Sequence, residues 1–196
     1  MVVFKYFEED YAERYTAAAI LLREFQTAAG ASVRESETRH LKLRAWASNP
    51  RVWAGATITL VLEVELKPGL HVYAPGVQPS YIPVQWGMTD TKAWLANPAR
   101  FPPSRRLRLE AIQETVPVFE NRFRLTRELK IGHVPQLREA LGQSRDVRVE
   151  GSFRYQACDE KLCHPPQTVP LEWSFPLVDL DRQRAPAELR GGKGPA

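Results

Sequence analysis

The chain lacks an apolar run that could cross a bilayer. Its longest candidate, Ala17 to Leu22, is closed by Arg23, and a transmembrane helix needs roughly 18 or more apolar residues. The first residues also lack the basic leader and small-residue cleavage site of a secretory signal peptide. We therefore expect neither a membrane span nor an export signal in the sequence as printed.

The chain also lacks a strong excess of charge of one sign. Lys and Arg number 27 against 23 Asp and Glu, which gives a net charge of +4, and the charges are interspersed along the sequence. This balance argues against a nucleic-acid interface, which needs basic residues clustered on one face. With 196 residues, 43% of them hydrophobic, the chain is long enough to fold around a core without disulfides or metal.

Glycine is scarcer than proline, at 11 against 16 residues, which fits short strands joined by rigid turns. The clearest strand is Thr57–Leu66, whose even-numbered positions are apolar while most odd-numbered ones are polar. A short helix is predicted from Pro135 to Leu141, before Gly142. The remaining strands are predicted near residues 40–47, 70–73, 82–86, 107–112, 123–131, 147–155 and 169–175. These patterns predict a mainly β protein, a β-sandwich spanning residues 38–180.

The two ends of the chain differ from this pattern. Val2–Phe7 is typical of a strand, and acids from Glu8 open a helix that runs to about Gln26. One strand and one helix cannot make a core, so residues 1–30 are expected to pack on the sandwich or to end another domain. The Gly-rich residues 181–196 are predicted to be a disordered tail.

Cysteine is nearly absent, and the two present, Cys158 and Cys163, lie close together between two predicted strands. A connection this short can bring two Cα atoms to disulfide distance. As a staple, a loop of about six residues would contribute only roughly 2 kcal/mol, so a reversible redox pair is as plausible a use. His164 could stabilise a thiolate, whereas Asp159 and Glu160 would oppose one. Spacing alone leaves a structural disulfide, a redox pair and a metal site open.

The metal hypothesis is the weakest of the three. A closed zinc site needs four ligands, and Cys158, Cys163 and His164 supply three at most. Iron–sulfur clusters need more cysteines than the chain has. We therefore expect no metal and no cofactor. His71, between apolar neighbours, is more often a partly buried histidine than a catalyst. The five tryptophans are expected in the core, with a sugar-binding surface as a remaining alternative.

The cysteine segment resembles the N-terminal domain of the thiol:disulfide interchange protein DsbD. Tyr155-Gln156-Ala157-Cys158 is followed by Cys163-His164-Pro165-Pro166 and by Thr168-Val169-Pro170-Leu171. The family reads Y-Q-G-C, a short acidic loop, C-Y-P-P and then T-V-P-L. Lys67-Pro68-Gly69-Leu70-His71-Val72-Tyr73 is similar to a glycine and aromatic-rich strand of the family. The resemblance covers about residues 38 to 178.

This resemblance implies an immunoglobulin-like β-sandwich that relays electrons by thiol-disulfide exchange. Cys158 and Cys163 would be the exchanging pair, with Cys163 forming the mixed disulfide. Residues expected to line the site are His71, Tyr73, Tyr155, His164 and Phe119. The family shields its disulfide with a mobile cap loop, and the matching stretch here is 114–120, in which Phe119 or Val116 would act as the shield.

The resemblance also implies partners and a compartment. A thioredoxin-like domain would reduce the pair, which would then reduce substrate disulfides, as a protein-disulfide reductase does. Residues 2–25 resemble the last strand and helix of a thioredoxin fold, so a redoxin fused upstream is one hypothesis. A persistent disulfide favours the periplasm, although the sequence alone leaves the cytoplasm open. The main competing hypothesis is a non-enzymatic interaction module in which the disulfide only clips a loop.

The chain departs from the family in several places. Its cysteines are one residue closer together than is usual, Ala157 replaces a glycine, and His164 replaces a tyrosine. His71 stands where the family has another tyrosine. The cap stretch lacks the acid-acid-aromatic sequence of the family.

Overall fold

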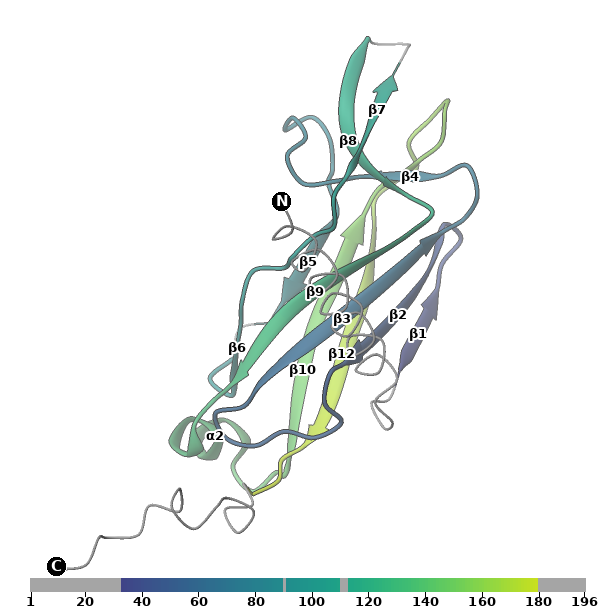
Figure 1. Ribbon diagram of the computed structural model, residues 1–196. Coiled ribbons are helices and arrows are strands. Elements are labelled where there is room, and N and C mark those ends of the chain that lie inside the picture. The colour runs from purple at the N-terminus through teal and green to yellow at the C-terminus, as the bar shows by residue number, and fades with distance from the viewer. Residues whose placement is uncertain (1–32, 90, 110–112, 180–196) are drawn as a thin grey trace, which may run out of the picture.

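A computed structural model describes residues 33–89, 91–109 and 113–179 (Figure 1). The expected N-terminal extension, 1–30, and tail, 181–196, lie outside the described residues. Within those residues, the strands and the helix are β1 (Arg34–Glu37), β2 (Leu41–Ala47), β3 (Thr57–Leu66), β4 (His71–Tyr73), β5 (Gln85–Met88), β6 (Trp94–Ala96), β7 (Arg105–Leu109), β8 (Glu114–Glu120), β9 (Arg122–Ile131), α2 (Val134–Leu141), β10 (Asp146–Tyr155), β11 (Ala157–Cys158) and β12 (Gln167–Pro176).

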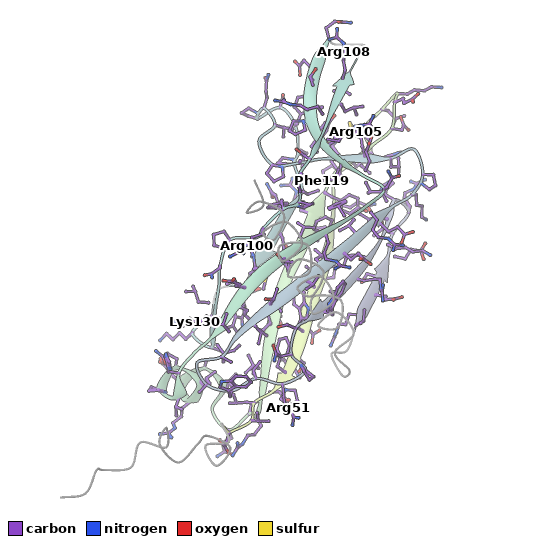
Figure 2. All side chains as sticks on the ribbon, viewed as in Figure 1. Arg51, Arg100, Arg105, Arg108, Phe119 and Lys130 are labelled. Atoms are coloured by element: carbon purple, nitrogen blue, oxygen red, sulfur yellow. A yellow bond between two sulfur atoms is a disulfide. The ribbon has the colours of Figure 1, made fainter. Side chains whose placement is uncertain are left out.

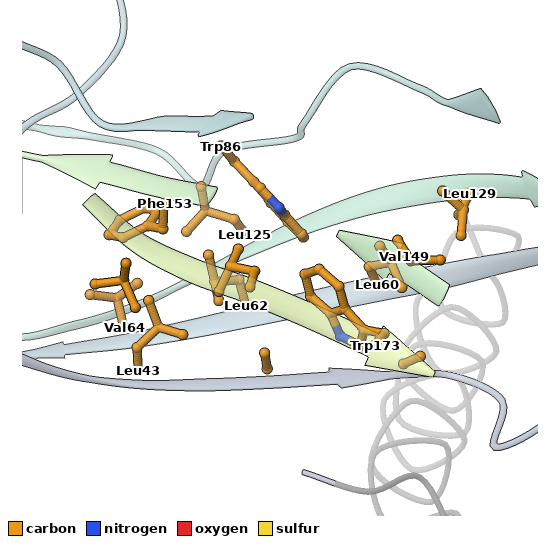
Figure 3. Packing of buried hydrophobic residues seen from close by; sticks show 14 of the residues in the cluster. Leu43, Leu60, Leu62, Val64, Trp86, Leu125, Leu129, Val149, Phe153 and Trp173 are labelled. Atoms are coloured by element: carbon orange, nitrogen blue, oxygen red, sulfur yellow. The ribbon is translucent and has the colours of Figure 1, made fainter. Parts of the chain in front are cut away.

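Two antiparallel sheets enclose the main core. One has the strand order β1-β2-β3-β9-β6, and the other has the order β12-β10-β5. The even-numbered residues of β3, from Ile58 to Leu66, are buried, as the alternation predicted. Figure 3 shows Leu62 and Leu125 of the first sheet packing with Phe153 and Trp173 of the second. The mainly β, immunoglobulin-like sandwich is confirmed.

A third sheet, of strand order β11-β4-β8-β7, lies at one end of the sandwich, and its β7–β8 hairpin projects beyond it (Figure 1). Two long strands hold this sheet in place. Strand β10 leads through Gln156 into β11, and β8 leads into β9 through Asn121, whose φ of 56° suits a tight turn. Figure 2 shows Arg105 and Arg108 on the projecting hairpin, and helix α2 lies at the opposite end of the molecule. Because the small sheet continues sandwich strands, its position is fixed by the main core.

Glu63 is the centre of an ion-pair network on the outer face of the larger sheet. Its side chain is 10% exposed and accepts a 2.8 Å hydrogen bond from Arg124, with Arg44 at 3.4 Å. Burial opposes ionisation, but the hydrogen bond and charge of Arg124, with Arg122 and Arg44, hold the pKa of Glu63 below its ordinary value. Arg124 also lies over the ring of Trp46, at 5.2 Å.

Replacing Glu63 by glutamine is expected to lower the free energy of unfolding by about 1–3 kcal/mol near pH 7, since two arginines lose their partner. A carboxyl whose pKa is lower in the folded state stabilises above its unfolded pKa, and this contribution is lost as the pH falls through its folded pKa. Urea unfolding at pH 7 and at pH 3 measures both effects. An equal loss at the two values would contradict the network. Glu37→Gln, at an exposed ion pair, is the matched control.

Candidate functional site

Cys158 and Cys163 form a disulfide on the small sheet, with Cα atoms 4.0 Å apart. Cys158 ends β11, which pairs with β4, and the two cysteines form an antiparallel bridge across a turn. Asp159 closes this turn: its Oδ1 accepts the backbone N–H groups of Lys161 at 2.7 Å and Leu162 at 2.9 Å. These two bonds lower the pKa of the Asp159 carboxyl. The Asp159 side chain therefore adds hydrogen bonds within the turn that the disulfide closes.

The two sulfur-bearing residues differ sharply in exposure. Cys158 is 1% exposed, whereas Cys163 lies at the surface. Leu162, beside Cys163, is 54% exposed, which is rare for a large apolar side chain in this structure. A thiolate in exchange must reach the sulfur it attacks along the sulfur–sulfur axis. Of the two sulfur-bearing residues, only Cys163 is therefore exposed to an incoming molecule.

A small apolar cluster, separate from the main core, covers Cys158. It consists of Tyr73, Val116, Val118 and Cys158, with Val77, Tyr81, Leu107 and Leu109 packed around it. The Tyr73 hydroxyl donates a hydrogen bond to Cys163 Sγ at 3.6 Å, and the Tyr73 and Tyr81 rings lie 4.7 Å apart. The projecting β7–β8 hairpin contributes four members of this cluster. Tyr73 thus touches the exposed sulfur while it shields the buried one.

A hydrogen bond ties the segment before β5 to the hairpin. The Tyr81 hydroxyl donates to Glu114 Oε2 at 2.6 Å. This hydrogen bond, before any other cause, raises the pKa of Tyr81 to about 12. Burial raises the pKa of Tyr73, and the charge of Glu114 adds to the effect. Both hydroxyls are therefore protonated near neutral pH and serve as hydrogen-bond donors.

His71 lies between Cys158 and Glu120 in one row across the small sheet. The pairing registers place His71 directly opposite Cys158 on β11 and opposite Glu120 on β8, and side chains at opposed positions share a face. His71 is 6% exposed, and its Nε2 is buried without a hydrogen-bond partner. Glu120 is held by Arg105 Nη1 at 2.6 Å. A disulfide sulfur, an imidazole and a carboxylate thus lie in neighbouring positions of one row.

On the other side of the loop, His164 stacks on His40, with ring centroids 4.6 Å apart. The His164 backbone N–H donates to Ala157, and its carbonyl accepts from the Gln156 amide at 3.1 Å. His40 is buried, and burial followed by the charge of His164 lowers its pKa. These contacts fix the segment after Cys163 against the β1–β2 turn.

The sequence-predicted site residues divide into two groups. Cys158, Cys163, His71 and Tyr73 meet at the disulfide, and His164 flanks it. Tyr155 instead lies in the main core, where its hydroxyl donates to Gln167 at 2.7 Å. Phe119 also points into the main core and stacks on Phe123 at 4.7 Å.

The stretch expected to match a cap loop, 114–120, is strand β8. Strand alternation gives it two faces, so Val116 and Val118 cover Cys158 while Phe119 faces the other way. Of the two shielding candidates, the structure thus places Val116 and not Phe119 at the disulfide.

Sequence reasoning did not select Tyr81, Glu114, Glu120 or His40. Tyr81 lies in an irregular segment without periodicity, and His40 precedes a strand far from the cysteines in sequence. Glu120 lay inside the predicted cap stretch, but only the pairing of β4 with β8 places it beside His71. No local pattern marks these residues.

In the part of the chain that the structure describes, no three His, Cys, Asp or Glu side chains gather closely enough to hold a metal ion. Nor does any helix there have the length and apolar character that a bilayer crossing requires.

Two solved structures are similar to this chain. The N-terminal periplasmic domain of ScsB from Proteus mirabilis has a TM-score of 0.47 at 16% identity, and the match covers 74% of this chain and 49% of that one. The chain thus spans about half the length of the ScsB domain. The reduced N-terminal domain of DsbD from Neisseria meningitidis has a TM-score of 0.40 at 13% identity, with 60% of this chain and 77% of that one covered.

The search of curated proteins finds no match. A family profile does match, over residues 41–172, which include both cysteines and almost the whole described sandwich. The matched family is described as thiol:disulfide interchange protein DsbD, N-terminal. The chain belongs to this family, that of the N-terminal domain of DsbD.

Proposed function

We propose that this domain relays electrons between a thioredoxin-like donor and a substrate disulfide through Cys158 and Cys163. The observation that carries the proposal is the asymmetry of the disulfide, which exposes Cys163 and buries Cys158 on a rigid sheet. Family membership supports thiol-disulfide exchange as the chemistry. A structural clip has no need for an exposed sulfur beside an exposed leucine.

The relay has two halves. A partner thiolate attacks Cys163 Sγ, the Cys158–Cys163 bond breaks, and its electron pair stays on Cys158. The partner's second thiolate then attacks the partner sulfur of the mixed disulfide and releases Cys163 as a thiolate. The reduced pair passes the two electrons on when Cys163 attacks a substrate disulfide and Cys158 closes the ring again. The Tyr73 hydroxyl supports the Cys163 sulfur in each step by its hydrogen bond.

We propose the periplasm as the compartment, because a disulfide persists in an oxidising space and the similar ScsB domain is described as periplasmic. The proposed partners are thioredoxin-like domains, whose exposed dithiols suit an exposed sulfur. The further proposal that a redoxin domain is fused upstream in the natural protein depends only on the sequence pattern of residues 1–30.

Trapping tests the relay. Cys158→Ser leaves Cys163 as the sole thiol, so it is expected to attack a thioredoxin that retains only its exposed cysteine, activated as a thionitrobenzoate adduct. The reaction forms a protein–protein disulfide and releases thionitrobenzoate, because no second thiol remains to resolve the product. Non-reducing gels and the colour of the released thiol measure it.

The double variant Cys158→Ser/Cys163→Ser is the matched control and should give no adduct. A single-cysteine protein of no redox function, activated in the same way, tests selectivity. Adduct formation no faster with thioredoxin than with that protein would favour the loop-clip hypothesis over the relay.

A further inference from the structure

His71 has an unexplained feature for a histidine in a well-packed protein. His71 is only 6% exposed, yet its Nε2 has no hydrogen-bond partner among the described residues. Leaving a buried polar group unpaired costs free energy, so native structures rarely do it without a reason. The groups that face His71 are Cys158 on β11, Glu120 on β8 and Tyr73 on its own strand, with Asp159 nearby in the turn.

Opening of the disulfide would give His71 Nε2 the hydrogen-bond partner that it lacks, namely the Cys158 sulfur. Cys158 is the leaving sulfur and becomes a thiolate in an apolar cluster, where a negative charge is costly. The imidazole opposite it across β4 and β11 is the nearest described ionisable group in its row. Glu120, held by Arg105, lies on the far side of the same imidazole and favours its protonated form.

We propose that His71 is the acid–base group for Cys158, flanked on its other side by Glu120, so that the three residues act as one row. This inference rests on the proposed function and names the group that handles its buried proton. On reduction, protonated His71 donates its Nε2 proton to the Cys158 thiolate as the sulfur–sulfur bond breaks. On reoxidation, His71 takes the Cys158 proton while the sulfur attacks Cys163 and the substrate thiolate leaves. The same proton thus moves from His71 to Cys158 on reduction and returns to His71 on reoxidation.

The electrostatics of His71 support this balance. Burial holds the pKa of His71 below its ordinary value, and the charges of Glu120 and Asp159 offset only part of this effect. The charged imidazole therefore gives up its proton readily and the neutral imidazole can accept one, which a general acid–base needs. Glu120 is the carboxylate that the sheet itself fixes opposite the imidazole, whereas Asp159 lies in the turn and accepts the N–H groups of Lys161 and Leu162.

The test measures Cys158 directly. In the Cys163→Ser protein, Cys158 is the sole thiol, and thiolate absorbance follows its ionisation with pH. His71→Phe keeps a ring of similar shape without the nitrogens, and it is expected to reduce the thiolate fraction at pH 7 about tenfold, since the variant has no imidazole to take up the thiol proton and pair with the thiolate. Glu120→Gln should act in the same direction but more weakly. His133→Gln, at the start of the distant helix α2, is the matched control and should change nothing.

A second measurement follows the reaction. With both cysteines present, His71→Phe is expected to slow closure of the ring on a mixed disulfide about tenfold at pH 7, and to flatten its pH profile between pH 5.5 and 8. If the phenylalanine variant does not fold, His71→Gln serves instead, because its amide cannot transfer a proton in this range. Unchanged thiolate absorbance together with an unchanged pH profile overturns the role of His71.

The two proposals fail separately. One outcome is that the parent protein exchanges with thioredoxin while the His71 variants keep its thiolate absorbance and pH profile. In that case the relay stands and the row Cys158–His71–Glu120 is structural. If the parent protein forms no adduct with thioredoxin, the relay fails, whatever the thiolate absorbance of Cys158 shows.

Discussion

Cys163→Ser is expected to react with the activated thioredoxin at least a hundredfold more slowly than Cys158→Ser. Each variant retains one thiol, but Cys158 is 1% exposed and lies beneath Tyr73, Val116 and Val118. A partner could reach it only after the small sheet opens locally, and each tenfold loss of rate corresponds to about 1.4 kcal/mol of opening. The release of thionitrobenzoate, followed over time, gives both rates under the same conditions.

The comparison also establishes the order of attack. Reaction of both variants with a small activated disulfide controls for the size of the partner, because a small molecule can reach a partly buried sulfur that a protein cannot. The difference between the variants should therefore be larger with thioredoxin than with the small reagent. Equal rates with thioredoxin would mean that the described burial of Cys158 does not govern access, and the assignment of Cys163 as the attacked sulfur would be wrong.

Phe153→Ala is expected to lower the free energy of unfolding by about 3–5 kcal/mol, the cost of a buried phenylalanine cavity. Phe153 has no exposed surface, lies opposite Val169 on β12 and Trp86 on β5, and packs beside Leu125 in Figure 3. Phe153 therefore packs both within its own sheet and against the larger sheet. For a domain of this size the melting temperature should fall by roughly 6–20 °C. Urea unfolding at an unchanged m value measures the loss.

Leu95→Ala is the matched control for this prediction. Leu95 is a large apolar residue in strand β6 but is 65% exposed, so its truncation is expected to change stability by less than about 0.5 kcal/mol. A loss at Phe153 no greater than at Leu95 would contradict the packing of the two sheets. Because β10 leads directly into β11, a weakened core should also make Cys158 more reactive toward small thiol reagents.

The long strands were predictable because each buries one face. The alternation of Thr57–Leu66 and of the predicted strand at 123–131 matches β3 and β9 closely, and the helix before Gly142 is α2. Strands β1, β6, β8 and β11 were not predicted as strands. β1 and β6 are three or four residues long and lie at the edges of the larger sheet. A strand of this length has too few positions to show a period.

The cysteine pair, its short turn and the family were all readable in the sequence, because each depends on residues that are neighbours along the chain. The sequence could not determine which sulfur is buried, that Phe119 faces the core, or that Glu120 lies beside His71. Those facts depend on strand pairing between segments far apart in sequence, and on the face of the sheet that each pairing register selects. A shift of one residue in the β4–β8 register would move His71 away from Glu120, and only the packed tertiary structure fixes that register.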